Sequence, residues 1–519
     1  CDYWGNAFYK ICSNFVSRYI FIFFLIDNIK ISNMAKAKKK KSVESSRAKL
    51  TAEHPIISKK IDKSLKLSVR EGSYASISSG LGLSYLSPFA LALNATASQV
   101  GILHAIINLL PSIVQLKTAK LIEKFPRKKI VRAGVLWKIL LWIPIMLTGL
   151  LFYLGVPHMV WTLIVFVGLF YAAGAVAHSS WFSWMGSLVP EDNRGRYFSK
   201  RNRITGFCGI LTMILGAIFL DGAKKIGSNM GNVIGFTLLG FGLLFAISAL
   251  TKIMSLTLLK KQYEPRLIVR KKDYFSLWQF LKSAPQTAFG RFVLFRGAFS
   301  FAIAIAGPFW VVYMIRDLGF SYVWYMAITI SGTAFQLMFL PLLGKMSDRF
   351  GNIKVMTICS WLVITTPLLW IGSAFVSSDL GIKLYLLFVP AIVSGFAWAG
   401  YMLATNNYVY DAVSGPKRSF GLAYMNLSVG VGMFLGASLG SILAWIDISF
   451  MNPILFIFAI SGIGRLLVAM FGLGKLHEVR NVKKFSSHYM IREFHPMQGA
   501  VREIHHLEHL VKGVEHHTG

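Results

Sequence analysis

Long apolar runs alternate with short polar segments along most of this chain. A helix needs about 20 consecutive apolar residues to cross the ~30 Å hydrocarbon layer of a membrane, and twelve runs after Glu71 meet this length. The runs cover about 72–94, 98–120, 130–154, 159–188, 200–221, 231–258, 289–315, 321–343, 353–376, 383–411, 419–446 and 452–474. The pattern predicts an all-α membrane protein with twelve transmembrane helices.

Polar segments divide the chain into six parts. We expect 34–70 to be a basic cytoplasmic segment, 71–258 an N-terminal six-helix bundle, 259–288 a cytoplasmic linker, 289–474 a C-terminal six-helix bundle and 475–519 a cytoplasmic tail. The first methionine is Met34, and the apolar stretch before it is too short to span a membrane. We therefore interpret residues 1–33 as a non-native upstream extension, with an interfacial anchor as the alternative.

Composition and charge narrow the class of protein. Of the 519 residues, 55% are hydrophobic and 15% are charged, yet the net charge is +33. A nucleic-acid-binding protein gathers its cations on a polar surface, whereas the cations here form short clusters between apolar runs. The composition therefore excludes a soluble enzyme and a nucleic-acid partner, and it indicates a lipid bilayer as the surroundings of the chain.

The positive charge also predicts an orientation in the membrane. The segments on one side of the predicted helices carry 44 Lys and Arg residues, and the segments on the other side carry four. Positively charged loops stay on the cytoplasmic side of a membrane. We therefore expect a multi-pass protein of the cytoplasmic (inner) membrane with both termini in the cytoplasm.

The two halves of the chain repeat each other. Residues 119–125 align with 344–350 at an offset of 225, and residues 173–181 align with 399–407 at an offset of 226. The order is preserved and each half has an even number of helices, so the two bundles are predicted to be pseudo-symmetric with the same topology. Many transporters place a binding site between two such repeats.

The segment Gly344-Lys345-Met346-Ser347-Asp348-Arg349-Phe350-Gly351 lies between predicted helices 8 and 9. It resembles the loop motif of the major facilitator superfamily, in which a Gly and an Asp-Arg pair precede a second Gly and basic residues. Pro190-Glu191-Asp192-Asn193-Arg194-Gly195-Arg196 is similar to another loop of that family, while Glu123 and Lys124 replace Asp and Arg in the first-half copy. The resemblance covers about 70–475 and implies a monomeric, prokaryotic-type transporter.

The resemblance also implies a gate at the cytoplasmic ends of the helices. Asp348 would accept hydrogen bonds from the amides at the start of helix 5, near Arg196, when the cytoplasmic side is closed. By pseudo-symmetry, Glu123 would meet the start of helix 11. The gating residues expected at this end are Glu123, Lys124, Arg194, Arg196, Gly344, Asp348, Arg349, Asp411 and Arg418.

Polar groups at bilayer depth are costly and usually face a cavity. The resemblance implies that helices 1, 4, 7 and 10 line this cavity, with helices 2, 5, 8 and 11 beside them. The candidate substrate-binding residues are Tyr85, His104, Asn108, His178, Trp181, Arg296, Trp310, Gln336, Asn406 and Asn407. For Arg296, an ion pair with Glu71 or Asp411 is the alternative. Lys138 and Lys252 are expected to extend their ammonium groups to the cytoplasmic surface.

These features predict a secondary active transporter that moves a small solute by rocker-switch alternating access. An ATP-driven pump is excluded because the chain has no Gly-x-x-x-x-Gly-Lys-Ser/Thr loop, and an enzyme because its outer segments carry only isolated aspartates such as Asp221. The expected partners are the solute and a coupling proton or cation, with His104 and His178 as titrating groups. No metal or cofactor is expected. A lipid or polyprenyl-linked substrate flippase, or a multidrug exporter of the same fold, is the alternative.

Overall fold

Every regular element that the structure describes is a helix. The computed structural model describes residues 55–189, 194–265, 277–413, 418–446, 451–480 and 482. The first bundle consists of α3 Pro55–Leu81, η1 Leu83–Tyr85, α4 Leu86–Ala92, α5 Ala97–Lys124, α6 Arg127–Tyr153, α7 Met159–Leu188, α8 Arg194–Asn229 and α9 Val233–Lys261. The short helix α10 Leu277–Ser283 precedes the second bundle.

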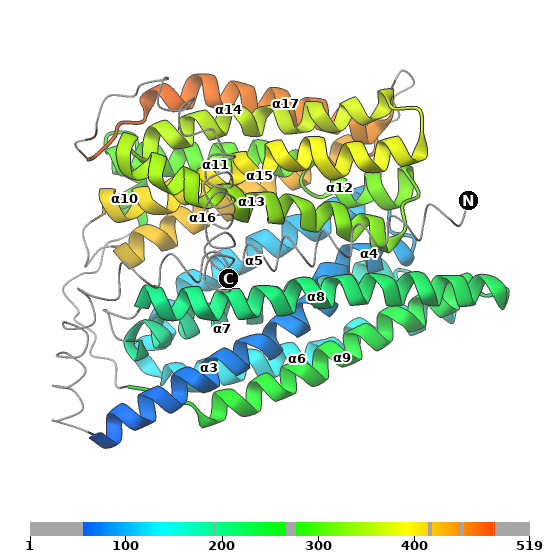
Figure 1. Cartoon of the computed structure of the whole chain (residues 1–519), viewed down its shortest axis with the longest axis horizontal. Helices are drawn as coiled ribbons and strands as arrows, with labels where there is room; N and C mark the ends of the chain where they lie inside the picture. The colour runs from blue at the N-terminus through cyan, green and yellow to red at the C-terminus, as the bar shows by residue number, and fades with distance from the viewer. Residues whose placement is uncertain are drawn as a thin grey trace, which may run out of the picture.

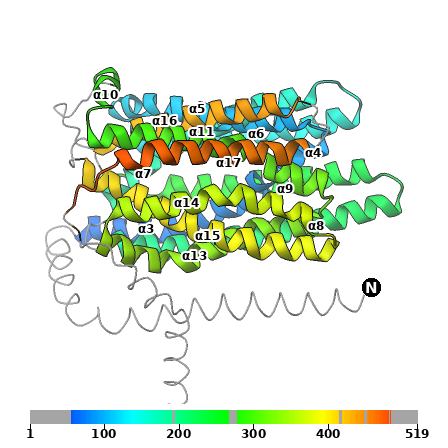
Figure 2. The same ribbon diagram turned by 90° about the horizontal axis from the view of Figure 1, so that it is seen from above.

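The second bundle has the same plan as the first. It consists of α11 Ala288–Ala306, α12 Phe309–Val312, η4 Tyr313–Asp317, α13 Tyr322–Phe350, α14 Asn352–Ile371, η5 Gly372–Phe375, α15 Asp379–Ala412, α16 Arg418–Leu443, α17 Pro453–Gly472 and η7 Leu473–Lys475. The two bundles lie side by side, with the first below and the second above in the view of Figure 1. Figure 2 gives the view from above, in which helices of the two bundles overlap. The predicted all-α fold of two bundles is confirmed.

Eleven of the described helices are long and apolar enough to cross a membrane. The remaining segment of the expected twelve is broken, because α3 ends at Leu81 and η1 separates it from α4. At the break, a Cβ on Gly82 would approach the ring of Trp142 to 2.5 Å, so only glycine fits. The helix also begins at Pro55 rather than near residue 72, since α3 continues through the polar residues that precede the apolar run.

The seventh segment is broken at the corresponding place. Helix α11 ends at Ala306, and Pro308 is the N-cap of α12, which continues into the π-turn η4. Proline lacks the backbone N–H that continues a helix and is tolerated in a first turn. Pro88 occupies the first turn of α4 in the same way. The repeated proline therefore interrupts the first membrane segment of each bundle.

The buried apolar core is distributed unevenly along the bundles. We call the end where α5 joins α6 and α13 joins α14 the basic end, because the basic loops lie there, and the other end the opposite end. In the opposite half, one cluster combines residues of both bundles, among them Phe89, Phe309 and Tyr322. In the basic half, the main clusters are a first-bundle cluster around Trp184 and a second-bundle cluster around Tyr408, against which Leu116 of α5 also packs. The bundles therefore share their main buried core in the opposite half.

Helices α11 and α16 of the second bundle pack with their backbones in direct contact. Gly432, Gly436 and Gly440 follow one another at four-residue spacing on α16, and each faces a carbonyl oxygen of α11. Small residues at this spacing let two membrane helices approach closely. A Cβ on Gly436 would collide with the carbonyl oxygen of Phe301, so the contact requires glycine.

Replacing Gly436 by alanine should destabilise the second bundle, because the added methyl group forces α11 and α16 apart. We expect a loss of about 1–3 kcal/mol, seen as a lower Tm of the purified protein. Gly242 of α9 provides a matched control, since nothing lies within 4 Å of its Cβ position. Gly242→Ala should leave the Tm unchanged or raise it slightly. Equal Tm values for the two variants would contradict the close packing.

Candidate functional site

A cavity of about 290 Å³ lies in the first bundle, between η1, α5, α6 and α7. Apolar and polar side chains share its wall. The apolar part includes Leu83, Pro111, Phe170 and Ala175, and the polar part is Gln115, Lys138, Tyr171, His178 and Ser179. Nδ2 of Asn426 on α16 lies 3.5 Å from Oε1 of Gln115, so the cavity borders the second bundle. A few polar groups on an apolar wall are typical of small-molecule sites.

His178 lines this cavity, as the sequence predicted, whereas three other first-bundle candidates make contacts within their own bundle. The hydroxyl of Tyr85 donates a hydrogen bond to a backbone carbonyl of α8. Nε2 of His104 lies 3.0 Å from a serine hydroxyl of α4. The amide of Asn108 donates to the carbonyl of His104 over 2.7 Å. These three side chains therefore satisfy their polar groups by helix–helix and intrahelical hydrogen bonds.

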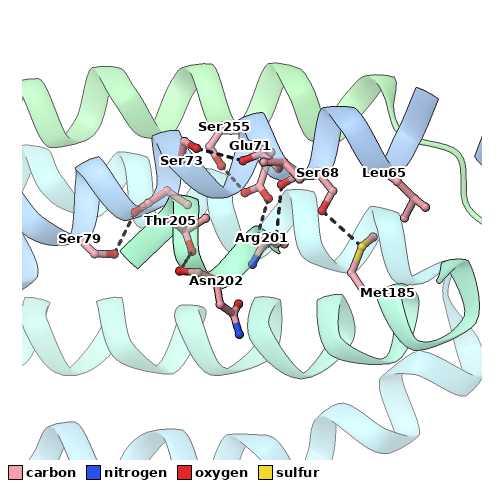
Figure 3. A network of polar contacts seen from close by, with 12 residues as sticks. Leu65, Ser68, Glu71, Ser73, Ser79, Met185, Arg201, Asn202, Thr205 and Ser255 are labelled. Atoms are coloured by element: carbon pink, nitrogen blue, oxygen red, sulfur yellow. Dashed lines mark hydrogen bonds and ion pairs between the residues drawn. The ribbon is translucent and has the colours of Figure 1, made fainter. Parts of the chain in front are cut away.

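Trp181 contacts Arg201, which belongs to a polar network of the first bundle. Figure 3 shows this network around Glu71 and Arg201. The guanidinium carbon of Arg201 lies 4.4 Å from the centre of the Trp181 ring. Nη2 of Arg201 is 3.5 Å from Oε2 of Glu71, and Ser255 donates to Oε1 of the same carboxylate over 2.8 Å. The network joins α3, α8 and α9. In this structure Glu71 pairs with Arg201 rather than with Arg296, the alternative partner.

The second-bundle candidates lie apart from this cavity. Arg296 is buried, and its guanidinium carbon lies 5.1 Å from the centre of the Tyr401 ring. Trp310 packs against Trp370 and Phe458, with ring centroids 4.7 and 4.0 Å away. Gln336 and Asn407 are half-buried, and Asn406 is exposed. Of the ten candidates, the structure places only His178 in the wall of the described cavity.

Lys138 is a cavity residue that the sequence analysis placed elsewhere. It was expected to reach the cytoplasmic surface, but its Nζ lies over the ring of Phe170, 4.4 Å from the ring centre, in the cavity wall. A Cβ on Gly174 of the neighbouring helix would lie 3.4 Å from this Nζ, so the lysine side chain lies directly beside this glycine. The sequence shows that Lys138 lies inside an apolar run, but it does not show whether the side chain points to the membrane surface or into a cavity.

At the basic end, the expected gating residues whose side chains the structure describes are mostly exposed, and Asp411 has its partners within the second bundle. Lys124, Arg196, Asp348 and Arg349 are exposed, and Gly344 is half-buried. Asp411 pairs with Arg480 at 3.1 Å and accepts a hydrogen bond from Asn352 at 2.6 Å, both within the second bundle. In this structure Asp411 therefore pairs with Arg480 rather than with Arg296. The side chains of Glu123, Arg194 and Arg418 lie outside the described residues.

At the opposite end, Asp221 of α8 caps a helix of the other bundle. Its carboxylate oxygens accept hydrogen bonds from the backbone N–H groups of Tyr322 and Val323, each over 2.9 Å. These are the first amides of α13, which lack intrahelical partners and where the helix dipole favours a negative charge. In the sequence Asp221 is only an isolated acidic residue, because its pairing depends on the packing of α8 against α13.

Comparison with known proteins identifies the family. A family model described as Major Facilitator Superfamily matches residues 73–335 and 294–499. The class B tetracycline resistance protein of Escherichia coli is 30% identical over 146 residues, which are 28% of this chain and 33% of that protein. This chain therefore matches about a third of the length of that relative.

Solved structures of transporters share the fold at low sequence identity. A D-xylose–proton symporter has a TM-score of 0.61 at 15% identity, covering 81% of this chain and 100% of that one. A bacterial homologue of the iron transporter ferroportin in an inward-facing state has a TM-score of 0.59 at 14% identity, covering 80% of this chain and 98% of that one. A mutant of the nucleoside transporter NupG has a TM-score of 0.56 at 14% identity, covering 80% of this chain and 100% of that one. With two matching bundles and a family model that covers most of the chain, the protein belongs to the Major Facilitator Superfamily and is a multi-pass membrane transporter.

Proposed function

We propose that this transporter is a secondary carrier that moves a small solute across the cytoplasmic membrane by rocker-switch alternating access. The observation that carries the proposal is the uneven core. One cluster is shared by both bundles in the opposite half, whereas each bundle has its own main cluster in the basic half, where α5 still contacts α16. Two rigid bodies that are held together more tightly at one end than at the other can rock about a central site. With the basic end in the cytoplasm, this arrangement is the inward-open state.

Helices α8 and α13 offer a contact for each of the two states. Asp221, toward one end of α8, caps the start of α13 in this structure. Asp348 lies at the other end of α13, and the two helices run antiparallel. We propose that Asp348 caps the start of α8 when the basic end closes. Because both helices are long and stiff, rocking that forms one cap breaks the other.

Drug export is the second candidate function. Its support is the partial match to the tetracycline resistance protein. The cavity favours a small polar solute, because Gln115, Lys138, Tyr171, His178 and Ser179 give its wall a polar side. A ligand screen by thermal unfolding separates the candidates, since a ligand raises the Tm by mass action. Stabilisation by hydrophobic drugs alone would favour export, and stabilisation by a polar metabolite would favour the first proposal.

Asp221→Asn should shift the equilibrium away from the inward-open state. The variant keeps the shape of the side chain and removes the charge that the first amides of α13 stabilise, which is worth about 1–2 kcal/mol, or roughly tenfold in the equilibrium. A cysteine introduced by Ser179→Cys in the cavity wall reports the state, in a background in which Cys1, Cys12 and Cys208 are replaced by alanine and the buried Cys359 is kept. Its labelling by an impermeant maleimide from the basic side should slow several-fold.

Asp379→Asn is the matched control for this experiment. Asp379 also lies in the first turn of a helix at the opposite end, but it pairs with Lys383 of its own helix. Labelling should therefore keep its rate in the control. An unchanged rate in Asp221→Asn, or an equal decrease in both variants, would show that Asp221 does not hold the inward-open state.

Asp348→Asn should shift the same equilibrium in the other direction. Loss of this carboxylate weakens the cap proposed for the closed basic end, so the cysteine introduced by Ser179→Cys should label at least as fast from the basic side as in the parent protein. Membrane insertion should be normal and solute flux reduced, because one half of the cycle is impaired. Slower labelling, or undiminished flux, would remove Asp348 from the gate.

A further inference from the structure

Lys138 and Lys252 are half-buried cations of the membrane helices that have no hydrogen bond or ion pair among the described residues, and of the two only Lys138 lines the cavity. Arg465 donates hydrogen bonds to the carbonyl of Val363 at 2.9 Å and to the hydroxyl of Thr366 at 2.8 Å. Arg201 pairs with Glu71. Among the described residues, Lys138 has neither a hydrogen bond nor an ion pair, and its ammonium group contacts the face of the Phe170 ring. A charge at bilayer depth is costly unless it is paired.

The charged groups around Lys138 increase this imbalance. Lys138 and Lys252 repel each other, and His178 lies within electrostatic reach of Lys138 and Arg201. Glu71 lies within electrostatic reach of Lys252 and already accepts hydrogen bonds from Arg201 and Ser255. Among the residues that line the cavity, Lys138 is the one lysine, and no carboxylate accompanies it. A cavity with a positive charge in its wall attracts an anion.

The pseudo-symmetry of the chain indicates that Lys138 is not needed to build a bundle. At offsets of 225 and 226, the equivalent positions in the second bundle are the buried, apolar Val363 and Ile364. The helix pairing is therefore compatible with an aliphatic side chain at this place. In the first bundle, a lysine occupies this place, and its ammonium group lies in the cavity wall beside Gly174.

We propose that the cavity binds a small organic anion and that Lys138 is the counter-charge for its carboxylate or phosphate group. Gln115, Ser179 and His178 line the polar side of the cavity around that group, and Phe170 and Leu83 contact the apolar part of the solute. The proposal rests on the transport function and names its substrate class. The anion neutralises Lys138, so binding removes the unpaired charge before the bundles close around the site.

The test compares anions with uncharged molecules of nearly the same shape. Purified full-length protein is heated with benzoate or benzamide, with glucuronate or glucose, and with inorganic phosphate, all at one ionic strength. At least one anion should raise the Tm of the parent protein, and its uncharged counterpart should not. In Lys138→Gln the affinity for that anion should fall at least tenfold, and in Lys138→Arg it should stay within about threefold of the parent value.

Two features keep the test decisive. Lys138→Gln removes an unpaired buried charge, so its Tm without ligand should equal or exceed that of the parent, which verifies folding. Lys252→Gln is the control, because Lys252 is a lysine of the first bundle that lies outside the cavity wall, and it should retain anion binding. The proposal is overturned if no anion of the series stabilises the parent, if benzamide or glucose binds as well as its anion, or if Lys138→Gln binds unchanged.

Uptake by reconstituted vesicles separates this proposal from the proposed function. Lys138-dependent binding of an anion that is never carried across the membrane would leave the anion site standing and refute the transport proposal. Carriage of glucose at a rate that Lys138→Gln does not change would leave transport standing and refute the anion site. Carriage of the anion that is lost in Lys138→Gln and kept in Lys138→Arg would support both.

Discussion

The buried contact between the two bundles in the opposite half is the constraint on which the rest of the structure depends. Lipid is as apolar as the helices, so packing and polar contacts, rather than the hydrophobic effect, hold membrane helices together. Here the shared apolar cluster provides the packing, and Asp221 on the first amides of α13 provides the polar contact. In the basic half the apolar core is divided, and the cavity with Lys138 lies in the first bundle beside the second.

Rocking also requires that each bundle moves as a unit. In the first bundle, the network of Glu71, Arg201 and Ser255 ties three helices together with charged hydrogen bonds inside the membrane. In the second bundle, Arg465 binds a carbonyl and a hydroxyl of α14, and Gly436 lets α16 contact the backbone of α11. These contacts lie within the bundles, so a change at the interface between the bundles leaves them intact.

Periodicity and charge were enough to predict the helices, because a membrane span needs a length and a polarity that are visible in the sequence. The internal repeat predicted the two bundles, and the resemblance of the loop motifs predicted the family. The cavity was harder to predict for a physical reason. Tyr85 and His104 are polar residues in apolar runs, but each has a hydrogen-bond partner on a neighbouring helix. The hydrogen bond offsets the free-energy cost of burying the polar group, and no ligand is needed. Lys138 has no such partner, and this difference depends on side-chain direction and on the packing of α6 against α7.

The same reasoning explains why Asp221 was missed and why its role links the site to the motion. A carboxylate at a helix end stabilises whichever helix N-terminus lies opposite, and only the packing of α8 against α13 determines that partner. Distances between spin labels in the parent protein in lipid vesicles test the account most directly, with one label pair at Lys124 and Lys345 of the basic end and a second at Met230 and Phe375 of the opposite end. The account predicts two populations for each pair, with the basic-end distance short whenever the opposite-end distance is long. A single fixed distance at both ends, or distances that lengthen and shorten together, would contradict it.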